Sequence, residues 1–149
     1  MEIDELFLHP KYDDATLTYD IALLKLKDSL DLNIYTPACL PEANSQWLGE
    51  TAWVYGWGMW DNTIDEISPV LKETKVVIRD AECEQIIHGH HEVCAFATDS
   101  DSCKGDSGGP LTVEDVDEGR HFLVSVVSTG TFPCAQVTSH CFILCSFTS

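Results

Sequence analysis

The chain has 149 residues, 44% of them hydrophobic, and its 8 basic and 25 acidic side chains give a formal net charge of −17. The apolar content is that of a globular protein and argues against wholesale disorder. The acidic charge disfavours nucleic acid and anionic membranes as partners, because both bind basic surfaces. A solvated acidic face explains this charge, and part of it could steer basic substrates.

Short β-like runs separated by Gly, Pro, Asn and Asp predict an all-β protein. The predicted strands cover, in chain order, residues 21–26, 51–56, 70–78, 93–96, 111–113 and 122–128. Residues 30–40 are expected to form an irregular linker, and Gly56-Trp57-Gly58 is expected to turn the chain. A short helix is expected over 81–87, because the Asp80 carboxylate can accept from the free amides of a first turn.

Seven cysteines in so short a chain predict an oxidising, extracellular compartment. The odd number leaves one thiol free or paired outside the chain. The acidic start, residues 1–5, lacks the apolar core of a secretory signal. The longest apolar runs, residues 122–127 and 141–147, are too short to cross a membrane. We therefore expect the true N-terminus to lie upstream of Met1.

The run from Asp101 to Pro110, Asp-Ser-Cys-Lys-Gly-Asp-Ser-Gly-Gly-Pro, carries a candidate nucleophile. Ser107 stands close to three glycines, which let a backbone turn sharply and approach a ligand closely. A serine hydroxyl attacks well when a neighbouring base removes its proton. The amides of Gly105 and Ser107 could point at a developing oxyanion. A plain Gly-rich hairpin turn is the alternative.

Together with Asp-Ile-Ala-Leu-Leu over residues 20–24, this run resembles the chymotrypsin/trypsin family of serine endopeptidases, and the resemblance extends over residues 6–136. It implies an all-β, trypsin-like double β-barrel, here mostly the second barrel plus a remnant of the first. Residues 1–136 are then a partial protease domain and residues 137–149 a divergent tail. Because the tail shows no strand or helix of the family, we expect an incomplete barrel with an uncovered edge.

The resemblance implies that Ser107 is the nucleophile, that Asp20 orients an imidazole and stabilises its cation, and that the amides of Gly105 and Ser107 form the oxyanion hole. Taken alone, Asp20 is more often a turn or cap residue. In the family the general-base histidine lies about 45 residues upstream of the aspartate. Only 19 residues precede Asp20, and their one histidine, His9, belongs to a His-Pro pair typical of a surface feature.

A chain without the general base is expected to be nearly inactive, because losing it costs about a million-fold in turnover. His88, His90 and His91 could suggest a metal site, but no second ligand set accompanies them, and a polar loop is favoured. We predict no metal and no cofactor.

The resemblance implies that Asp101, six residues before Ser107, lies at the base of the specificity pocket and selects Arg or Lys. A carboxylate in an apolar slot is costly unless a cation pairs with it, which agrees with this role. An exposed loop acid is the alternative. Ser128 and Gly130 resemble the substrate-binding pocket wall, with Thr129 in place of Trp. The expected partners are polypeptide substrates with Arg or Lys.

The resemblance also implies disulfides, which would pair Cys83 with Cys94 and Cys103 with Cys134. A further bridge of many family members is absent, and its two positions are occupied by Ala52 and Val113. Cys39 occupies a position that in many relatives bonds to an N-terminal light chain or propeptide. No assignment follows for Cys141 and Cys145.

In the family, the residue at the position of Asp106 forms an ion pair with a new N-terminal amine freed by zymogen cleavage. The chain shows no such cleavage site, so we expect Asp106 to be a buried or semi-buried acid without its partner, which is destabilising. A trypsin-like endopeptidase is therefore the first interpretation. The alternatives are an inactive homologue that acts as a binding or regulatory module, and a truncated chain that does not fold alone.

Overall fold

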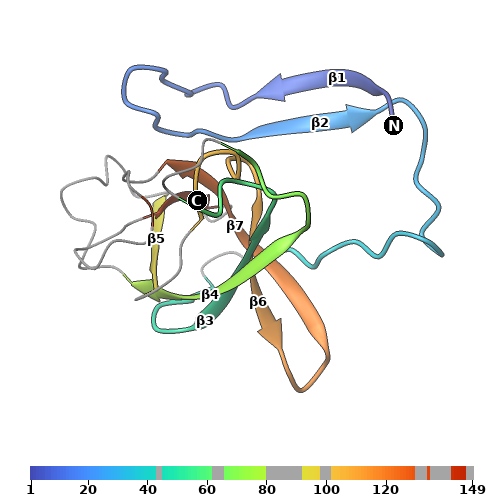
Figure 1. Cartoon of the computed structure of the whole chain (residues 1–149). Helices are drawn as coiled ribbons and strands as arrows, with labels where there is room; N and C mark the ends of the chain where they lie inside the picture. The colour runs from blue at the N-terminus through green and yellow to red at the C-terminus, as the bar shows by residue number, and fades with distance from the viewer. Residues whose placement is uncertain are drawn as a thin grey trace.

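The computed structural model describes residues 1–42, 45–61, 66–79, 92–97, 102–129, 134 and 142–146. Its strands are β1 (Ile3–Leu8), β2 (Ala22–Leu26), β3 (Thr51–Gly56), β4 (Lys72–Arg79), β5 (Glu92–Phe96), β6 (Pro110–Asp115), β7 (Arg120–Thr129) and β8 (Phe142–Ser146). β1 and β2 form a two-stranded sheet, and the other six form a closed barrel in the order β3-β4-β5-β8-β7-β6 (Figure 1). The predicted all-β class, with one barrel and a remnant of another, is confirmed.

The barrel core follows from alternation along its strands. Successive side chains of a strand point to opposite faces, so every second residue faces inward. In β3 these residues are Ala52 and Val54, which pair with Val113 and Leu111 of β6. The other buried apolar side chains are those of Val76, Ile78, Ala95, Val124 and Val127. Full burial of a Val or Leu side chain contributes about 1.5–3 kcal/mol, so this small set is the main apolar stabilisation of the barrel.

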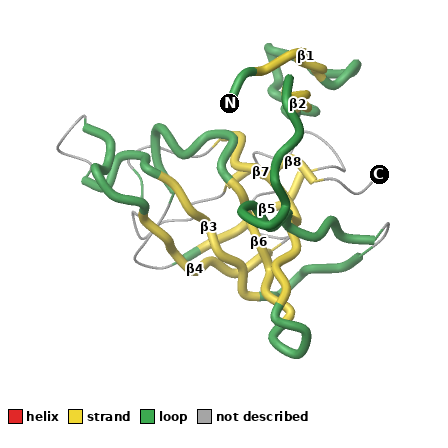
Figure 2. Tube along the Cα trace, turned by 90° about the vertical axis from the view of Figure 1, so that its right-hand side faces the viewer, coloured by secondary structure: helices red, strands yellow, loops and turns green. Residues whose placement is uncertain are grey.

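The β1–β2 hairpin lies to one side of the barrel in both views (Figures 1 and 2). The six strands predicted from the sequence are all present, but β1 is an addition. Its Asp4 and Glu5 interrupt the apolar pattern, which is why the sequence does not predict a strand there. Lys25 of β2 compensates this charge, since its Nζ lies 2.8 Å from an Asp4 carboxylate oxygen and 3.8 Å from one of Glu5.

The C-terminal tail differs from expectation. β8 lies between β5 and β7, pairs antiparallel with both, and closes the barrel. The expectation of an incomplete barrel without a strand after residue 137 is therefore wrong. Its run, Phe-Ile-Leu-Cys-Ser, has no polar–apolar alternation, so it carries no period-2 signal that would predict a strand there. The expected helix over 81–87 lies outside the described residues. No helix of the described part is long and apolar enough to span a membrane.

The linker between hairpin and barrel is irregular, as predicted, but it is docked on β7. The Cys39 amide donates to the His121 carbonyl at 2.9 Å, and the Leu123 amide donates to the Cys39 carbonyl at 2.8 Å. Farther along, the Trp47 ring lies 5.8 Å from the Phe122 ring, centroid to centroid. The linker thus adds a short parallel bridge to the outside of the barrel.

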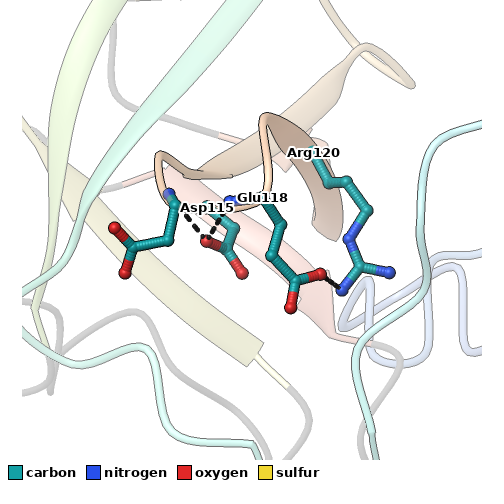
Figure 3. A network of polar contacts seen from close by, with 4 residues as sticks. Asp115, Glu118 and Arg120 are labelled. Atoms are coloured by element: carbon teal, nitrogen blue, oxygen red, sulfur yellow. Dashed lines mark hydrogen bonds and ion pairs between the residues drawn. The ribbon is translucent and has the colours of Figure 1, made fainter.

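A tight acidic turn joins β6 to β7 (Figure 3). One carboxylate oxygen of Asp115 accepts from the amides of Asp117 and Glu118, at 3.1 and 3.2 Å, and Glu118 pairs with Arg120. An Asp that accepts from amides two and three residues on is a common way to start a turn. The turn sets the β6–β7 register from Asp115 to Thr112, and a bulge between Leu111 and Thr112 shifts it by one residue, so that Pro110 lies opposite Val126. Pro110 is the last residue of the candidate nucleophile run, so this register sets where that run meets β7.

The opposed pair Ala52 and Val113 gives a test of the barrel register. Opposed residues of an antiparallel pair have Cα atoms about 4.5–5.5 Å apart, inside the disulfide range of about 4.4–6.8 Å. The double variant A52C/V113C should form the missing bridge and stabilise the fold by about 2–4 kcal/mol. Peptide mapping and thermal unfolding with and without reductant measure this. A52C alone is the control, and two unpaired thiols in the oxidised double variant would contradict the register.

Candidate functional site

Ser107 is exposed on a loop that leads from the buried Ser102 into β6. The disulfide between Cys103 and Cys134 anchors the start of this loop, with a Cα–Cα distance of 5.7 Å, so the predicted pairing is confirmed. The end of the loop is anchored on β7. The Gly108 amide donates to the Val127 carbonyl at 2.7 Å, and the Val127 amide donates to the Gly109 carbonyl at 2.9 Å. The candidate nucleophile is therefore held on a rigid frame with its side chain in solvent.

The backbone amides of this loop divide into two groups. Those of Cys103, Asp106, Gly108 and Gly109 all donate to acceptors within the protein. Within the described residues, no acceptor is found for the amides of Gly105 and Ser107. Gly105 has a φ of 96°, a left-handed value that favours glycine. The two amides without an acceptor are the pair that the resemblance assigns to the oxyanion hole.

The Asp106 carboxylate ties the loop of Ser107 to the turn at Gly58. One of its oxygens accepts from the Gly58 amide at 2.7 Å, and the other accepts from the Cys103 amide at 2.8 Å. Charge-assisted hydrogen bonds of this kind contribute about 1.5–3 kcal/mol each. Asp106 is half-buried, as expected, but the expected destabilisation is offset, because two backbone amides donate to its carboxylate. A second bond between the same segments runs from the Met59 amide to the Lys104 carbonyl, at 2.8 Å.

The turn Gly56-Trp57-Gly58 leaves the room that this carboxylate needs. A Cβ at Gly58 would lie 2.5 Å from Asp106 Cγ, and one at Gly56 would overlap the carboxylate as well. Side-chain atoms in ordinary contact do not approach so closely, so both positions require glycine. The sequence analysis identified the turn but missed this role, because nothing in a Gly-Trp-Gly run says which side chain packs on it.

Asp20 and Ser128 are brought together by the fold. The Ser128 hydroxyl donates to Asp20 Oδ2 at 2.7 Å, a length typical of a hydrogen bond to an ionised carboxylate. Ser128 directly follows Val127, the residue of β7 that holds the loop of Ser107. Asp20 is therefore linked to the nucleophile loop through two consecutive residues of one strand. The sequence predicted Ser128 as a pocket residue, and this contact with Asp20 was not foreseen.

Several predicted site residues lie outside the described part of the chain, namely Asp101, Gly130 and Cys83. Cys94 is disulfide-bonded, and its predicted partner is Cys83. Cys39 is a free, half-buried thiol on the linker.

Two of the histidines are described. His9 accepts from the Lys11 amide through Nδ1 at 3.2 Å, and His121 is exposed on β7. Neither ring hydrogen-bonds to Asp20 or Ser107. Within the described residues, no three His, Cys, Asp or Glu side chains are grouped as metal ligands would be.

Tyr12 is a neighbour of Asp20 that the sequence analysis missed. Partial burial, followed by the hydrogen bond of its hydroxyl to Asp14 and the charges of Asp14, Asp20 and Asp13, raises the pKa of Tyr12 above its ordinary value. The acidic residues around Tyr12 thus disfavour a further negative charge beside Asp20. No sequence signal could have found it, since this proximity depends on the turn after β1.

Comparison with known proteins gives one family. A model of the Trypsin family matches residues 1–145. The serine proteinase stubble of Drosophila melanogaster is 38% identical over 141 residues, which cover 87% of this chain and 18% of that protein. The transmembrane protease serine 7 of Mus musculus is 34% identical over 86% of this chain and 16% of its own length. An inactive CLIP domain-containing serine protease A3 of Aedes aegypti is 31% identical over 86% of this chain and 30% of its own length. The chain spans less than a third of each of these relatives.

The packing of Gly58 on Asp106 is testable by a double-mutant cycle. G58A should destabilise the fold by about 1–3 kcal/mol, the usual effect of overpacking. In a D106A background the carboxylate that the new methyl group meets is gone, so the same substitution should cost much less. Chemical denaturation of the unmodified protein, G58A, D106A and the double variant gives the coupling free energy between the two positions. If G58A lowered the free energy of unfolding equally in both backgrounds, the contact between residue 58 and the Asp106 carboxylate would be contradicted.

Proposed function

Because the chain belongs to the trypsin family of serine proteases, we propose that it is the nucleophile-bearing part of a serine endopeptidase that cleaves after Arg or Lys. A protease of this family acts on polypeptide substrates. The observation that carries the proposal is the bonding of the nucleophile loop: the amides of Cys103, Asp106, Gly108 and Gly109 have acceptors, whereas no acceptor is found within the described residues for those of Gly105 and Ser107, beside an exposed serine hydroxyl. Donors held in place without an acceptor suit a charge that develops during reaction.

In this mechanism Ser107 Oγ attacks the scissile carbonyl carbon while a histidine takes the hydroxyl proton. The carbonyl oxygen becomes an oxyanion and accepts from the amides of Gly105 and Ser107. The C–N bond then breaks, the leaving amine receives the proton from the histidine, and an acyl-enzyme remains. Water, deprotonated by the same histidine, attacks the ester, and Ser107 Oγ leaves and recovers its proton.

Asp20 is proposed to orient that histidine. Its Oδ2 accepts from Ser128, whereas Oδ1 has no donor among the described residues and is left for an imidazole N–H. A carboxylate in this position fixes the tautomer of the histidine. It also stabilises the imidazolium that forms when the histidine takes the proton of Ser107. His9 does not suit the role of the base, because its Nδ1 is occupied by the Lys11 amide. We propose that the base comes from a segment N-terminal to Met1 in a longer polypeptide.

The specificity and setting are also proposals. Asp101 would pair with the Arg or Lys side chain of the substrate. Cys39 would bond to an N-terminal light chain or propeptide, since its thiol is free and its backbone is fixed to β7 on both sides. Disulfide-bonded Cys94 and the Cys103–Cys134 bridge favour an extracellular setting.

A non-catalytic homologue that binds or regulates is the second candidate. Two observations favour it. Neither described histidine contacts Asp20 or Ser107, and one relative carries the name of an inactive protease. The amides of Gly105 and Ser107 favour the enzyme, because a binding module has no need of a pair of unengaged donors beside an exposed serine.

Ser107 labelling separates the two candidates. N-terminal peptide mapping of the native protein should recover peptides upstream of Met1 that contain a histidine. In that form a serine-directed phosphonate should label Ser107, and S107A should abolish the label. A protein that starts at Met1 should react about a million-fold more slowly for lack of the base. A histidine-bearing form that stays unlabelled would rule out the enzyme.

Substrate selection is tested with Arg and Lys esters in the same histidine-bearing form. D101N should lower kcat/KM by an amount equivalent to about 2–5 kcal/mol, because it leaves the substrate cation buried without a partner. Asp99→Asn, two residues away, is the matched control and should change little. If D99N has the larger effect, or if Arg and Lys esters are not hydrolysed at all, the assignment of Asp101 is wrong.

A further inference from the structure

The backbone around Asp20 reverses within three residues. The Ile21 amide donates to the Tyr19 carbonyl at 2.8 Å, which closes a turn with Asp20 at its centre. Tyr19 itself has a φ of 55°, in the left-handed region that side chains other than those of Gly, Asn and Asp rarely adopt. A backbone in this state persists where its surroundings hold it. The carboxylate that reaches Ser128 therefore follows directly on a strained residue.

An aromatic stack holds that strained residue. The His9 ring lies parallel to the Tyr19 ring, with centroids 4.7 Å apart and planes at 5°. The Lys11 ammonium lies 5.5 Å from the centroid of the Tyr19 ring.

His9 is in turn fixed by its own backbone. Its amide donates to the Ile21 carbonyl at 3.1 Å, its carbonyl accepts from the Tyr12 amide at 3.0 Å, and its Nδ1 accepts from the Lys11 amide at 3.2 Å. His9 is thus bonded to the residue after Asp20 and stacked on the residue before it. His9 therefore contacts both sequence neighbours of Asp20, Tyr19 and Ile21.

We propose that His9 and Tyr19 are positioning residues for Asp20, and that their ring stack holds the turn that presents the carboxylate to Ser128. The importance of that position for turnover rests on the proposed function. Neither ring is assigned a contact with substrate. The stack is suited to this task because Asp20 lies beyond the last β1–β2 pair, Leu8 with Ala22, and beyond the single further bond from the His9 amide to the Ile21 carbonyl.

The test compares His9→Ala with His9→Phe in the 149-residue chain. H9A removes the ring, whereas H9F keeps a stacking ring and loses the Nδ1 acceptor. NMR of the Asp20 carboxyl carbon reports the bond to Ser128, with S128A as the reference for a carboxylate without it. Hydrogen exchange of the Ile21 amide reports the turn.

In H9A the Asp20 signal should move toward its S128A position, and Ile21 exchange should accelerate about 2- to 10-fold, the factor expected for loss of one aromatic pair. H9F should stay close to the unmodified protein on both measures. Barrel amides such as those of Val54 and Val113 should exchange at unchanged rates in every variant, which controls for the fold.

A second variant, Tyr19→Gly, separates the ring from the strain. Glycine adopts a positive φ freely but carries no ring, so Y19G should loosen Asp20 as H9A does. Unchanged Asp20 and Ile21 signals in H9A or in Y19G would overturn the proposal, and so would an H9F protein as loose as H9A. These measurements need no turnover. A histidine-bearing form that hydrolyses nothing would count against the proposed function and leave this result intact.

Discussion

The Asp106 carboxylate is the contact on which the rest of the site depends. A half-buried charge needs donors, and it finds them in the amides of Gly58 and Cys103, from two segments that are far apart in the chain. This bond fixes the loop on which Ser107 is exposed, and it is possible because glycine at 56 and 58 leaves space for the carboxylate. The position of the candidate nucleophile is therefore set by an acid that has no part in the proposed chemistry.

β7 carries the other half of the arrangement. Val127 hydrogen-bonds to Gly108 and Gly109, and Ser128 hydrogen-bonds to Asp20, so one strand joins the nucleophile loop to the hairpin that carries Asp20. The linker docks on the same strand through Cys39. A rigid, central strand of a closed barrel is well suited to this, because its own position is fixed by ladders to β6 and β8.

Sequence reasoning succeeded where a local pattern decides the outcome. It identified six of the strands from their apolar runs, and the resemblance gave the Cys103–Cys134 bridge and the opposed pair Ala52 and Val113. It failed for β1, because Asp4 and Glu5 interrupt the apolar pattern and their pairing with Lys25 of β2 cannot be seen in the sequence. It also failed for β8, whose apolar run does not resemble a strand of the family. It also expected Asp106 to be destabilising without its amine partner, since the backbone amides that donate to its carboxylate leave no mark in a sequence.

The sequence by itself determined which reactive and bonding groups the protein carries. A serine among glycines, an aspartate before an apolar strand and paired cysteines are local features, and their residue types are set whatever the fold. Only the tertiary structure decided which of them meet: Ser128 with Asp20, Gly58 with Asp106, and His9 with Tyr19. The physical reason is that such bonds require separations of a few ångströms between side chains and amides whose directions depend on strand register, turn geometry and barrel closure, which are settled by packing of the whole chain.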